Sequence, residues 1–305
     1  MRLYSPKALW PVYIVVSLCL AFPAQAYVCS RVPDTTGSET GPSLSWYTRD
    51  LSYSIAAEDL PSADTAVIEE IFASSFAAWS NADSCNEEEG GLTDLRFEAQ
   101  TCCSSGTTIG YNFLTPTENE NLLIYRSVWP HPHQAGNVIA LTTTTYNSLS
   151  GEIFDADIEF NDEDFDFTLT DTNPQTDLMN TAVHEIGHVL GLGHTSVNNA
   201  TMEADATLGE ISKRDLECDD KNAITFKYPA NQENDYCELD EINCNATCTP
   251  PGTLDRSVVI DIAGYDDGIA EGVGCNANKK SSIWILLLLT IGVILHHRKR
   301  PHKAL

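Results

Sequence analysis

The stretch HEIGHVLGLGH, residues 184–194, places three histidines and one glutamate within eleven residues of an otherwise apolar run. His184 and His188 are four residues apart, so on an α-helix they lie on one face, with about 5–6 Å between their Cβ atoms. Gly191 can end that helix, because glycine adopts a left-handed backbone conformation at little cost. The chain then turns and brings back a third imidazole, His194. The spacing therefore predicts three imidazoles grouped at one end of a helix.

Three imidazoles grouped in this way favour a zinc ion over histidines that are simply packed or solvated. Two histidines one helical turn apart can share one tetrahedral metal, and His194 supplies a third ligand. Three protein ligands leave the fourth position open to water, as in catalytic zinc sites. Glu185 can reach that water without being a ligand itself. A bare HExxH pattern arises by chance far more often than the pattern extended by Gly191 and His194, so the extension carries the specificity.

The stretch 184–194 resembles the HExxHxxGxxH signature of the metzincin zinc peptidases. This likeness implies that His184, His188 and His194 bind Zn²⁺ and that Glu185 is the general base. It also implies an α+β fold, in which a twisted, mostly parallel sheet precedes the active-site helix, a methionine turn and a C-terminal helix.

The methionine turn of this family has a candidate in Met202, within the sequence NATMEAD. It follows His194 by eight residues, a spacing similar to that in the matrixin branch of the metzincins. The alternative is that Met202 only fills the core, as methionines often do. The likeness to a matrixin catalytic domain covers residues 45–229.

Hydrophobic periodicity predicts the elements that precede the motif. Apolar residues recur at helical spacing between Asp64 and Asn81, which favours a helix there. Short runs of β-branched and aromatic residues favour strands. Strands are expected at 46–55, 92–100, 137–147 and 151–161, the last two joined by a turn at 148–151. The segment from 100 to 130 is rich in Cys, Thr and Asn, and we interpret it as a family-specific insertion.

Two further helices are expected around and after the motif. Asn173 as N-cap with Pro174 at the first helical position predicts the start of the active-site helix, which runs to about Leu190. A last helix is expected over 212–226. The apolar residues of the active-site helix that should face the core are Leu178, Ala182, Ile186 and Val189.

Both ends of the chain carry features of an exported protein. Residues 1–26 have a basic start, an apolar stretch and Ala24-Gln25-Ala26, as in a signal peptide cleaved before Tyr27; a retained anchor is the alternative. Residues 281–305 have a short apolar core followed by basic residues, as in stop-transfer segments. With Cys275 upstream, this tail resembles the bacterial sorting tails of the MYXO-CTERM type, although a buried core helix is an alternative.

Between these ends we expect an N-terminal segment at 27–44, the catalytic domain at 45–229 and an acidic, Cys-containing stalk at 230–280. All 44 acidic residues lie between 27 and 280, against 11 of the 17 Lys and Arg residues. Such a surface disfavours nucleic acid and anionic membranes, so contact with a membrane is expected only through the C-terminal tail. The charge is compatible with basic substrates or calcium, or it serves solubility alone.

Of the ten cysteines, Cys19 lies in the expected signal peptide and Cys275 beside the tail. The other eight are an even number, which in an exported protein predicts up to four disulfides. Their connectivity cannot be deduced from sequence. The sequence CSRVPD, residues 29–34, faintly resembles the matrixin cysteine switch, but it has one residue too many before Val-Pro-Asp. We therefore expect Cys29 in a disulfide.

The acidic stretch DADIEFNDEDFDF, residues 155–167, is a candidate calcium site, since it is dense in hard oxygen ligands. Asp155, Asp157 and Glu159 alternate along a strand and so point the same way. They would hold Ca²⁺, as the resemblance to matrixins suggests, or form a solvated strand face. His131 and His133 do not match the family's second, structural zinc, and we interpret them as part of a surface loop near the substrate cleft.

The function that these residues favour is an exported zinc-dependent endopeptidase acting on protein or peptide substrates. In the alternative, a cell-surface binding or adhesion protein, a metzincin scaffold keeps zinc but lacks peptidase activity. A zinc hydrolase acting on non-peptide bonds is a third reading. The glutamate at 185 argues against a purely structural site, which has no use for a base beside the metal.

Overall fold

The computed structural model describes residues 27–61, 64–85, 91–100, 107–133 and 136–231, together with the backbone of two short strands further on. The expected signal peptide, 1–26, and apolar tail, 281–305, lie outside the described residues, as does most of the expected stalk. Within those ranges no helix is both long and apolar enough to cross a membrane.

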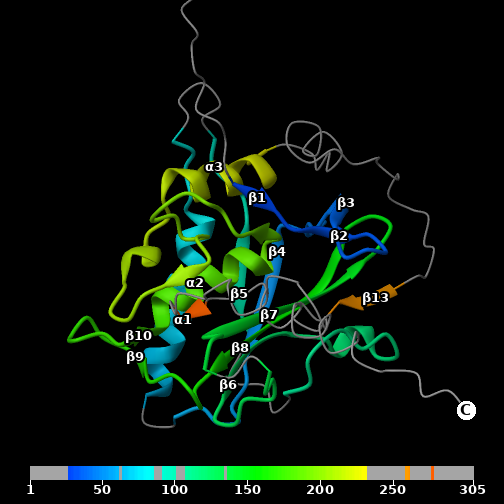
Figure 1. Ribbon diagram of the computed structural model, residues 1–305. Helices are drawn as coiled ribbons and strands as arrows, with labels where there is room; N and C mark the ends of the chain where they lie inside the picture. Colours follow the sequence, from blue (N-terminus) through cyan, green and yellow to red (C-terminus); the bar gives the residue numbers. More distant parts are fainter. Residues whose placement is uncertain are drawn as a thin grey trace, which may run out of the picture.

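A six-stranded, mostly parallel sheet forms the centre of the fold (Figure 1). Its order is β13–β7–β8–β6–β4–β5. Strands β4, β5, β6 and β8 run parallel to one another, whereas β7 is antiparallel to both β8 and β13. The bounds are β4 (Asp50–Ile55), β5 (Arg96–Ala99), β6 (Asn121–Arg126), β7 (Ala140–Asn147), β8 (Ile153–Asn161) and β13 (Val258–Asp261). The expected α+β fold with a mostly parallel sheet is confirmed.

The interpretation of 100–130 as an insertion is wrong in part, because β6 lies within it. This strand occupies the middle of the sheet, where Leu123 is in register with Ile55 of β4 and with Ile158 of β8. Residues 122–125 form an unbroken apolar run that is buried on both faces. Strands buried on both faces lack the alternating pattern that reveals half-exposed ones.

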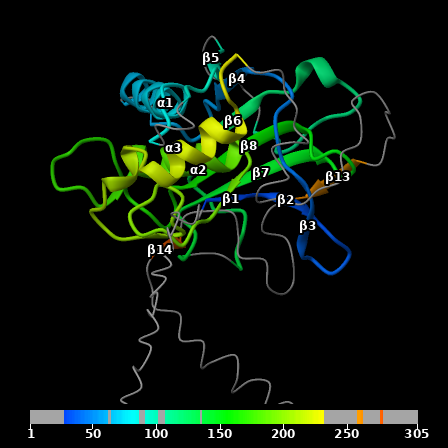
Figure 2. The same ribbon diagram turned by 90° about the horizontal axis from the view of Figure 1, so that it is seen from above.

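Helices α1 (Thr65–Ser80) and α2 (Leu178–Val189) pack against the same face of the sheet, as Figure 2 shows. The phenol ring of Tyr53 on β4 stacks on Phe76 of α1, with 4.1 Å between ring centroids. The predicted inward residues of α2 all lie in this main core, namely Leu178, Ala182, Ile186 and Val189. The helix predicted over 64–81 is confirmed almost to the residue.

The predicted start of α2 is wrong by several residues. Asn173 has a left-handed backbone (φ 53°), and the following strand β10 (Thr176–Asp177) pairs with β9 (Phe167–Thr168). The chain therefore does not enter the helix until Asp177, whose carboxylate caps the helix by accepting a hydrogen bond from Asn180 N at 2.8 Å. Aspartate and asparagine are about equally good N-caps, so residue type alone does not choose between Asn173 and Asp177. The pairing of β9 with β10 places the helix start at Asp177.

The last predicted helix is also shorter than expected. A single 3₁₀ turn, η2 (Ser212–Arg214), precedes helix α3 (Cys218–Lys227), and another, η1 (Pro116–Glu118), precedes β6. Glu217 and Asp220 form a capping box that starts α3. A disulfide joins Cys218, the first residue of α3, to Cys85 after α1. Cys29 is a buried free thiol, so the expectation that it forms a disulfide is wrong.

Besides β9 and β10, three further two-stranded pairs lie outside the central sheet. They are β1 (Val28–Cys29) with β11 (Leu192–Gly193), β2 (Arg31–Pro33) with β3 (Glu39–Ser43), and β12 (Asp205–Ala206) with β14 (Asn276–Ala277). Strand β11 directly precedes His194 in sequence, and β12 begins three residues after Met202.

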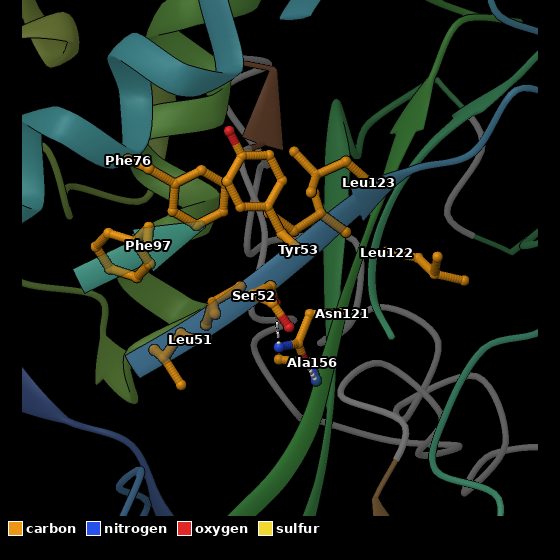
Figure 3. Close-up of a pocket in the computed structure, with 11 residues that line it drawn as sticks. Leu51, Ser52, Tyr53, Phe76, Phe97, Asn121, Leu122, Leu123 and Ala156 are labelled. Carbon is orange, nitrogen blue, oxygen red and sulfur yellow. Dashed lines mark hydrogen bonds between the residues drawn. The ribbon is translucent and has the colours of Figure 1, made fainter. Parts of the chain in front are cut away.

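Figure 3 shows a small cavity between the sheet and α1, lined by Tyr53, Phe76, Phe97 and Leu123 among other residues. Its volume is about 10 Å³, which is at the lower limit for a single water. The lining is almost entirely apolar, so this space is a packing gap in the core and not a ligand site.

Candidate metal centre and active site

His184, His188 and His194 meet at the end of α2, as the sequence predicts. Their possible ligand atoms all lie within 4.8 Å of one another. The Nε2 atom of His184 is 3.1 Å from that of His188 and 3.3 Å from that of His194. The side chains of His184 and His188 are buried. Three imidazole rings from one helix and the turn after it therefore face a single point.

The outer ring nitrogens fix how these imidazoles are protonated. His184 Nδ1 lies 2.6 Å from the carbonyl oxygen of Thr201, and His188 Nδ1 lies 2.8 Å from that of Leu192. A carbonyl oxygen only accepts, so each Nδ1 carries the proton and donates it. Each Nε2 then presents a lone pair, and two lone pairs about 3 Å apart repel unless a cation lies between them. The donor set therefore fits a metal ion that accepts imidazole nitrogen.

The same environment keeps the three imidazoles neutral, which is the form that binds a metal. Burial lowers the pKa of His184 and His188 well below the usual range, and the neighbouring imidazoles lower it further. Burial, together with the charge of Lys213, lowers the pKa of His194 to about 4. Lys213 is itself buried in η2 and donates to the carbonyl oxygen of Glu203.

The turn after α2 is held from both sides. Gly191 ends the helix with φ 76°, as predicted, and a Cβ at this position would overlap the carbonyl of Leu44. Strand β1 then pairs with β11 in the segment leading to His194, and Ser30 N donates to Gly191 O at 3.0 Å. The N-terminal segment thus fixes the position from which the third histidine returns.

Met202 packs against α2 at Gly187, between the two helical histidines in sequence. Its side chain is 3% exposed, and a Cβ added to Gly187 would overlap its sulfur. Glycine at 187 is therefore what lets the methionine approach the helix at the turn between the two helical histidines. Asp220 of α3 accepts hydrogen bonds from the backbone N–H groups of Thr201 and Met202, at 2.7 and 3.0 Å.

Glu185 is fully buried beside the triad and directed toward strand β7. Its Oε2 accepts a hydrogen bond from Thr142 Oγ1 at 2.7 Å. Because Thr142 lies on β7, this hydrogen bond joins the central sheet to Glu185 of the predicted active site. The site thus combines three neutral imidazoles with one oriented carboxylate.

Comparison with known proteins decides the family. The family model described as Matrixin matches residues 45–229, which is more than half of the chain and coincides with the predicted domain. The chain belongs to the matrixin family.

Curated relatives of this matrixin include plant metalloendoproteinases. It is 29% identical to Metalloendoproteinase 2-MMP of Arabidopsis thaliana over 251 residues, which is 81% of this chain and 54% of the relative. Shorter matches are 45% identical to Metalloendoproteinase 4-MMP over 22% of this chain and 19% of the relative, and 48% identical to Metalloendoproteinase 5-MMP over 19% and 16%, both of Arabidopsis thaliana. The chain thus spans about half the length of the first of these relatives and less of the others. Family membership implies zinc as the metal.

The three carboxylates on β8 of this matrixin do not form a solvated face. Asp155, Asp157 and Glu159 lie on one face of β8, as predicted from alternation, but each is at most 2% exposed. Asp157 accepts hydrogen bonds from Gly110 N and Leu122 N, at 2.7 and 2.9 Å. The segment around Gly110, within the presumed insertion, therefore covers this second face of the sheet.

Glu159 is already occupied by cationic and imidazole partners. Arg126 Nε donates to its Oε1 at 2.6 Å, and His131 Nε2 lies 3.0 Å from its Oε2. Burial alone would raise the pKa of Glu159, but these partners lower it. Among the described residues, only the histidine triad brings three His, Cys, Asp or Glu ligand atoms close enough for one ion.

Sequence reasoning missed Thr142, Asp220 and Lys213. Thr142 stands in a run of four threonines, and Asp220 in a pair of aspartates, so neither is singled out by its neighbours. Each acts on the site across a long separation in the chain, 43 residues for Thr142 and Glu185 and 18 for Asp220 and Met202. Only the fold reveals contacts of that kind.

Proposed function

We propose that this matrixin is an exported, zinc-dependent endopeptidase that hydrolyses peptide bonds of protein or peptide substrates. The observation that carries the proposal is the convergence of three imidazole Nε2 atoms beside one buried, oriented carboxylate. The plant relatives, which are named metalloendoproteinases, support the same activity.

His184, His188 and His194 would hold the zinc ion, and Met202 would support their base. A zinc ion held there supplies a Lewis acid for hydrolysis. Glu185 takes a proton from the attacking water and passes it to the leaving amine, which is general acid–base catalysis. Thr142 keeps the Glu185 carboxylate in one orientation through its hydroxyl group. A binding or adhesion protein would have no use for a glutamate held in this way.

The domain limits extend the proposal beyond the site. A signal peptide at 1–26 would direct export, 27–44 would lead into the catalytic domain at 45–229, and 230–280 would act as a stalk. The apolar tail at 281–305 would anchor or sort the protein at the cell surface. The Cys85–Cys218 disulfide supports an oxidising destination, since such bonds are rare in reducing compartments.

Calcium at Asp155, Asp157 and Glu159 is a separate proposal with a narrower basis. Asp155 Oδ2 is buried without a hydrogen-bond partner, which leaves one oxygen available to a cation. Glu159, in contrast, would have to exchange Arg126 or His131 for the ion.

Two substitutions in the full chain test the enzymatic proposal. Glu185→Gln should retain zinc and lose cleavage of a mixture of unfolded peptides, because the base is gone while the ligands remain. His188→Ala should lose zinc, measured by mass spectrometry of the metal after dialysis. Glu98→Gln, an exposed glutamate on β5, is the matched control and should cleave as the wild type does. Undiminished cleavage by Glu185→Gln would refute the role of that residue.

A further inference from the structure

Lys213 is a buried cation beside the histidine triad. Its side chain is 0% exposed, and its ammonium group donates to the carbonyl oxygen of Glu203, the residue after Met202. Lysine is almost never fully buried unless an anion compensates its charge, because an ammonium group taken out of water loses strong solvation. A lysine in this place therefore indicates either a hidden ion pair or a use for the charge itself.

No carboxylate of the described residues forms an ion pair with Lys213. The two glutamates between Met202 and Lys213 are engaged by backbone donors. Glu203 accepts from Asn199 N at 2.9 Å. Glu210 accepts from Thr207 N at 2.9 Å. The chain carries 44 acidic residues against 17 Lys and Arg, so a shortage of acids does not explain why the described part of the chain leaves this cation without one.

The backbone of Lys213 is fixed to the active-site helix and to the methionine turn. Lys213 N donates to Asn180 Oδ1 at 2.8 Å, and Thr201 Oγ1 donates to Lys213 O at 3.3 Å. Asn180 precedes His184 by four residues, so both lie on one face of α2. The carbonyl oxygen of the same Thr201 accepts from His184 Nδ1. The charge is therefore held in place next to the triad from two sides.

The charge of Lys213 reaches all three predicted metal ligands. Burial lowers the pKa of each of the three imidazoles, and the positive charge of Lys213 lowers it further. The ammonium group thus lies within electrostatic reach of the point on which the imidazoles converge. The second buried lysine in the described part of the chain, Lys227, is 2% exposed and donates to Ser43 Oγ at 2.9 Å. Its charge does not act on the triad in the same way.

We propose that Lys213 supplies a second positive charge to the metal centre, which repels the metal ion and attracts the negative charge that the substrate carbonyl develops during hydrolysis. This inference rests on the proposed function, since it takes the triad as the place where zinc binds and a peptide bond is cut. Lys213 is fully buried, so it acts through its electric field and through the Glu203 carbonyl. It is a positioning residue and not a catalytic one.

The sign of this single charge has two opposite consequences. A cation beside the triad raises the free energy of a bound dication, so it weakens metal binding. The same cation lowers the free energy of an anion at the site, and fixed charges that face developing negative charge are usually the largest contribution to catalysis. Removing the charge should therefore strengthen metal binding and weaken anion binding. A simple loss of structure would weaken both.

Three variants of the full chain separate the charge of Lys213 from its hydrogen bond. Lys213→Met removes both, Lys213→Gln removes the charge but keeps a donor, and Lys213→Arg keeps the charge. Lys227→Met is the matched control, because it removes a buried lysine whose charge does not act on the triad. If Lys213→Met does not fold, Lys213→Gln carries the test. If neither neutral variant folds, Lys213 is a structural residue and the proposal is wrong.

Zinc affinity is the first measurement, made by competition with a chelator at one fixed pH. We expect the dissociation constant for zinc to fall about tenfold in Lys213→Met and Lys213→Gln. It should match the wild type in Lys213→Arg and in Lys227→Met. A dissociation constant that stays the same or rises in the two neutral variants would overturn the proposal.

Anion affinity is the second measurement, with azide as a small anionic probe. Imidazole sites that bind zinc also accept Co²⁺, whose visible absorption changes when an anion joins the metal. Titration of the Co²⁺-loaded full chain with azide should give a dissociation constant about tenfold higher in the two neutral variants than in the wild type. Weaker azide binding together with weaker zinc binding would reveal a structural role alone and would count against the proposal.

Peptide cleavage distinguishes failure of this proposal from failure of the proposed function. At saturating zinc, kcat for a peptide substrate should fall about tenfold in Lys213→Gln and stay unchanged in Lys227→Met. If the wild type cleaves and Lys213→Gln cleaves equally fast, the proposal for Lys213 fails and the proposed function stands. If the wild type does not cleave although the zinc and azide affinities change as expected, the proposed function fails and the electrostatic role of Lys213 stands.

Discussion

The carboxylate of Asp220 accepts a hydrogen bond from the backbone N–H of Met202, with 3.0 Å between the two atoms. Its other oxygen accepts from Thr201 N, and the carbonyl of Thr201 accepts from His184. Helix α3 therefore positions the first histidine of the triad through a single carboxylate. This connection makes a residue far from the motif important for the metal site.

Replacing Asp220 by Asn should destabilise the protein by about 1–3 kcal/mol, because the amide nitrogen would face backbone donors. Zinc should also dissociate faster, since His184 loses the fixed carbonyl that orients it. Urea unfolding and zinc release to a chelator measure the two effects. The exposed Asp215→Asn is the control, and an Asp220→Asn protein as stable as this control would contradict the proposed link.

Thr142→Val should lower kcat while leaving the zinc content unchanged. The substitution keeps the shape of the side chain but removes the hydroxyl that donates to Glu185. A hydrogen bond to a charged group contributes about 1.5–3 kcal/mol, which corresponds to roughly 10- to 150-fold in rate if it acts fully in the transition state. Steady-state kinetics with Thr144→Val as control separates this effect from a general loss of stability. A normal kcat would show that Glu185 needs no such partner.

Gly187→Ala should disturb the site through packing alone. The new methyl group would overlap the sulfur of Met202 and press on the ring of Trp79. Overpacking of this kind costs about 1–3 kcal/mol. Adding Met202→Ala to the same chain should recover part of that loss by making room. Thermal unfolding of the two single variants and the double variant gives the coupling, and strictly additive effects would argue against contact between these residues.

The buried pair Asp155 and Asp157 should make stability depend on pH in an unusual direction. Burial raises the pKa of both carboxyl groups, and for Asp155 the neighbouring Asp157 raises it further. The folded state therefore holds protons that the unfolded chain releases near pH 4. It follows that stability falls as pH rises from that value toward the higher pKa of the folded state.

Asp155→Asn removes one of the two groups that release a proton in this pH range. Between pH 5 and 8, the melting temperature of this variant should therefore fall less than that of the wild type. Calcium provides the second comparison. If the ion binds here, adding it should raise the melting temperature of the wild type more at pH 8 than at pH 5, and should have less effect on Asp155→Asn. An unchanged melting temperature at both pH values would remove calcium from the description of this site.

The motif carried most of what could be predicted, because its spacing encodes local geometry. Residues 184–194 lie on one helix and one turn, so the convergence of the three histidines follows from helical periodicity and from Gly191. The strand β6 was overlooked, since burial on both faces erased its alternation. The N-cap of α2 is Asp177 and not the predicted Asn173. The pairing of β9 with β10 keeps the intervening residues out of the helix, and the sequence does not reveal that pairing. Thr142 and Asp220 depend on tertiary contacts, which local pattern cannot show.

The disulfide between Cys85 and Cys218 has a consequence for when the site assembles during biogenesis. Cys218 begins α3 two residues before Asp220, and its partner follows α1, so the bond fastens the helix that steadies the methionine turn. While both thiols are reduced, that helix start is held by non-covalent contacts alone. A newly made chain in a thiol-rich compartment would thus have a looser metal centre than the same chain after oxidation. The metal centre would therefore reach its final, ordered geometry only after the Cys85–Cys218 disulfide has formed.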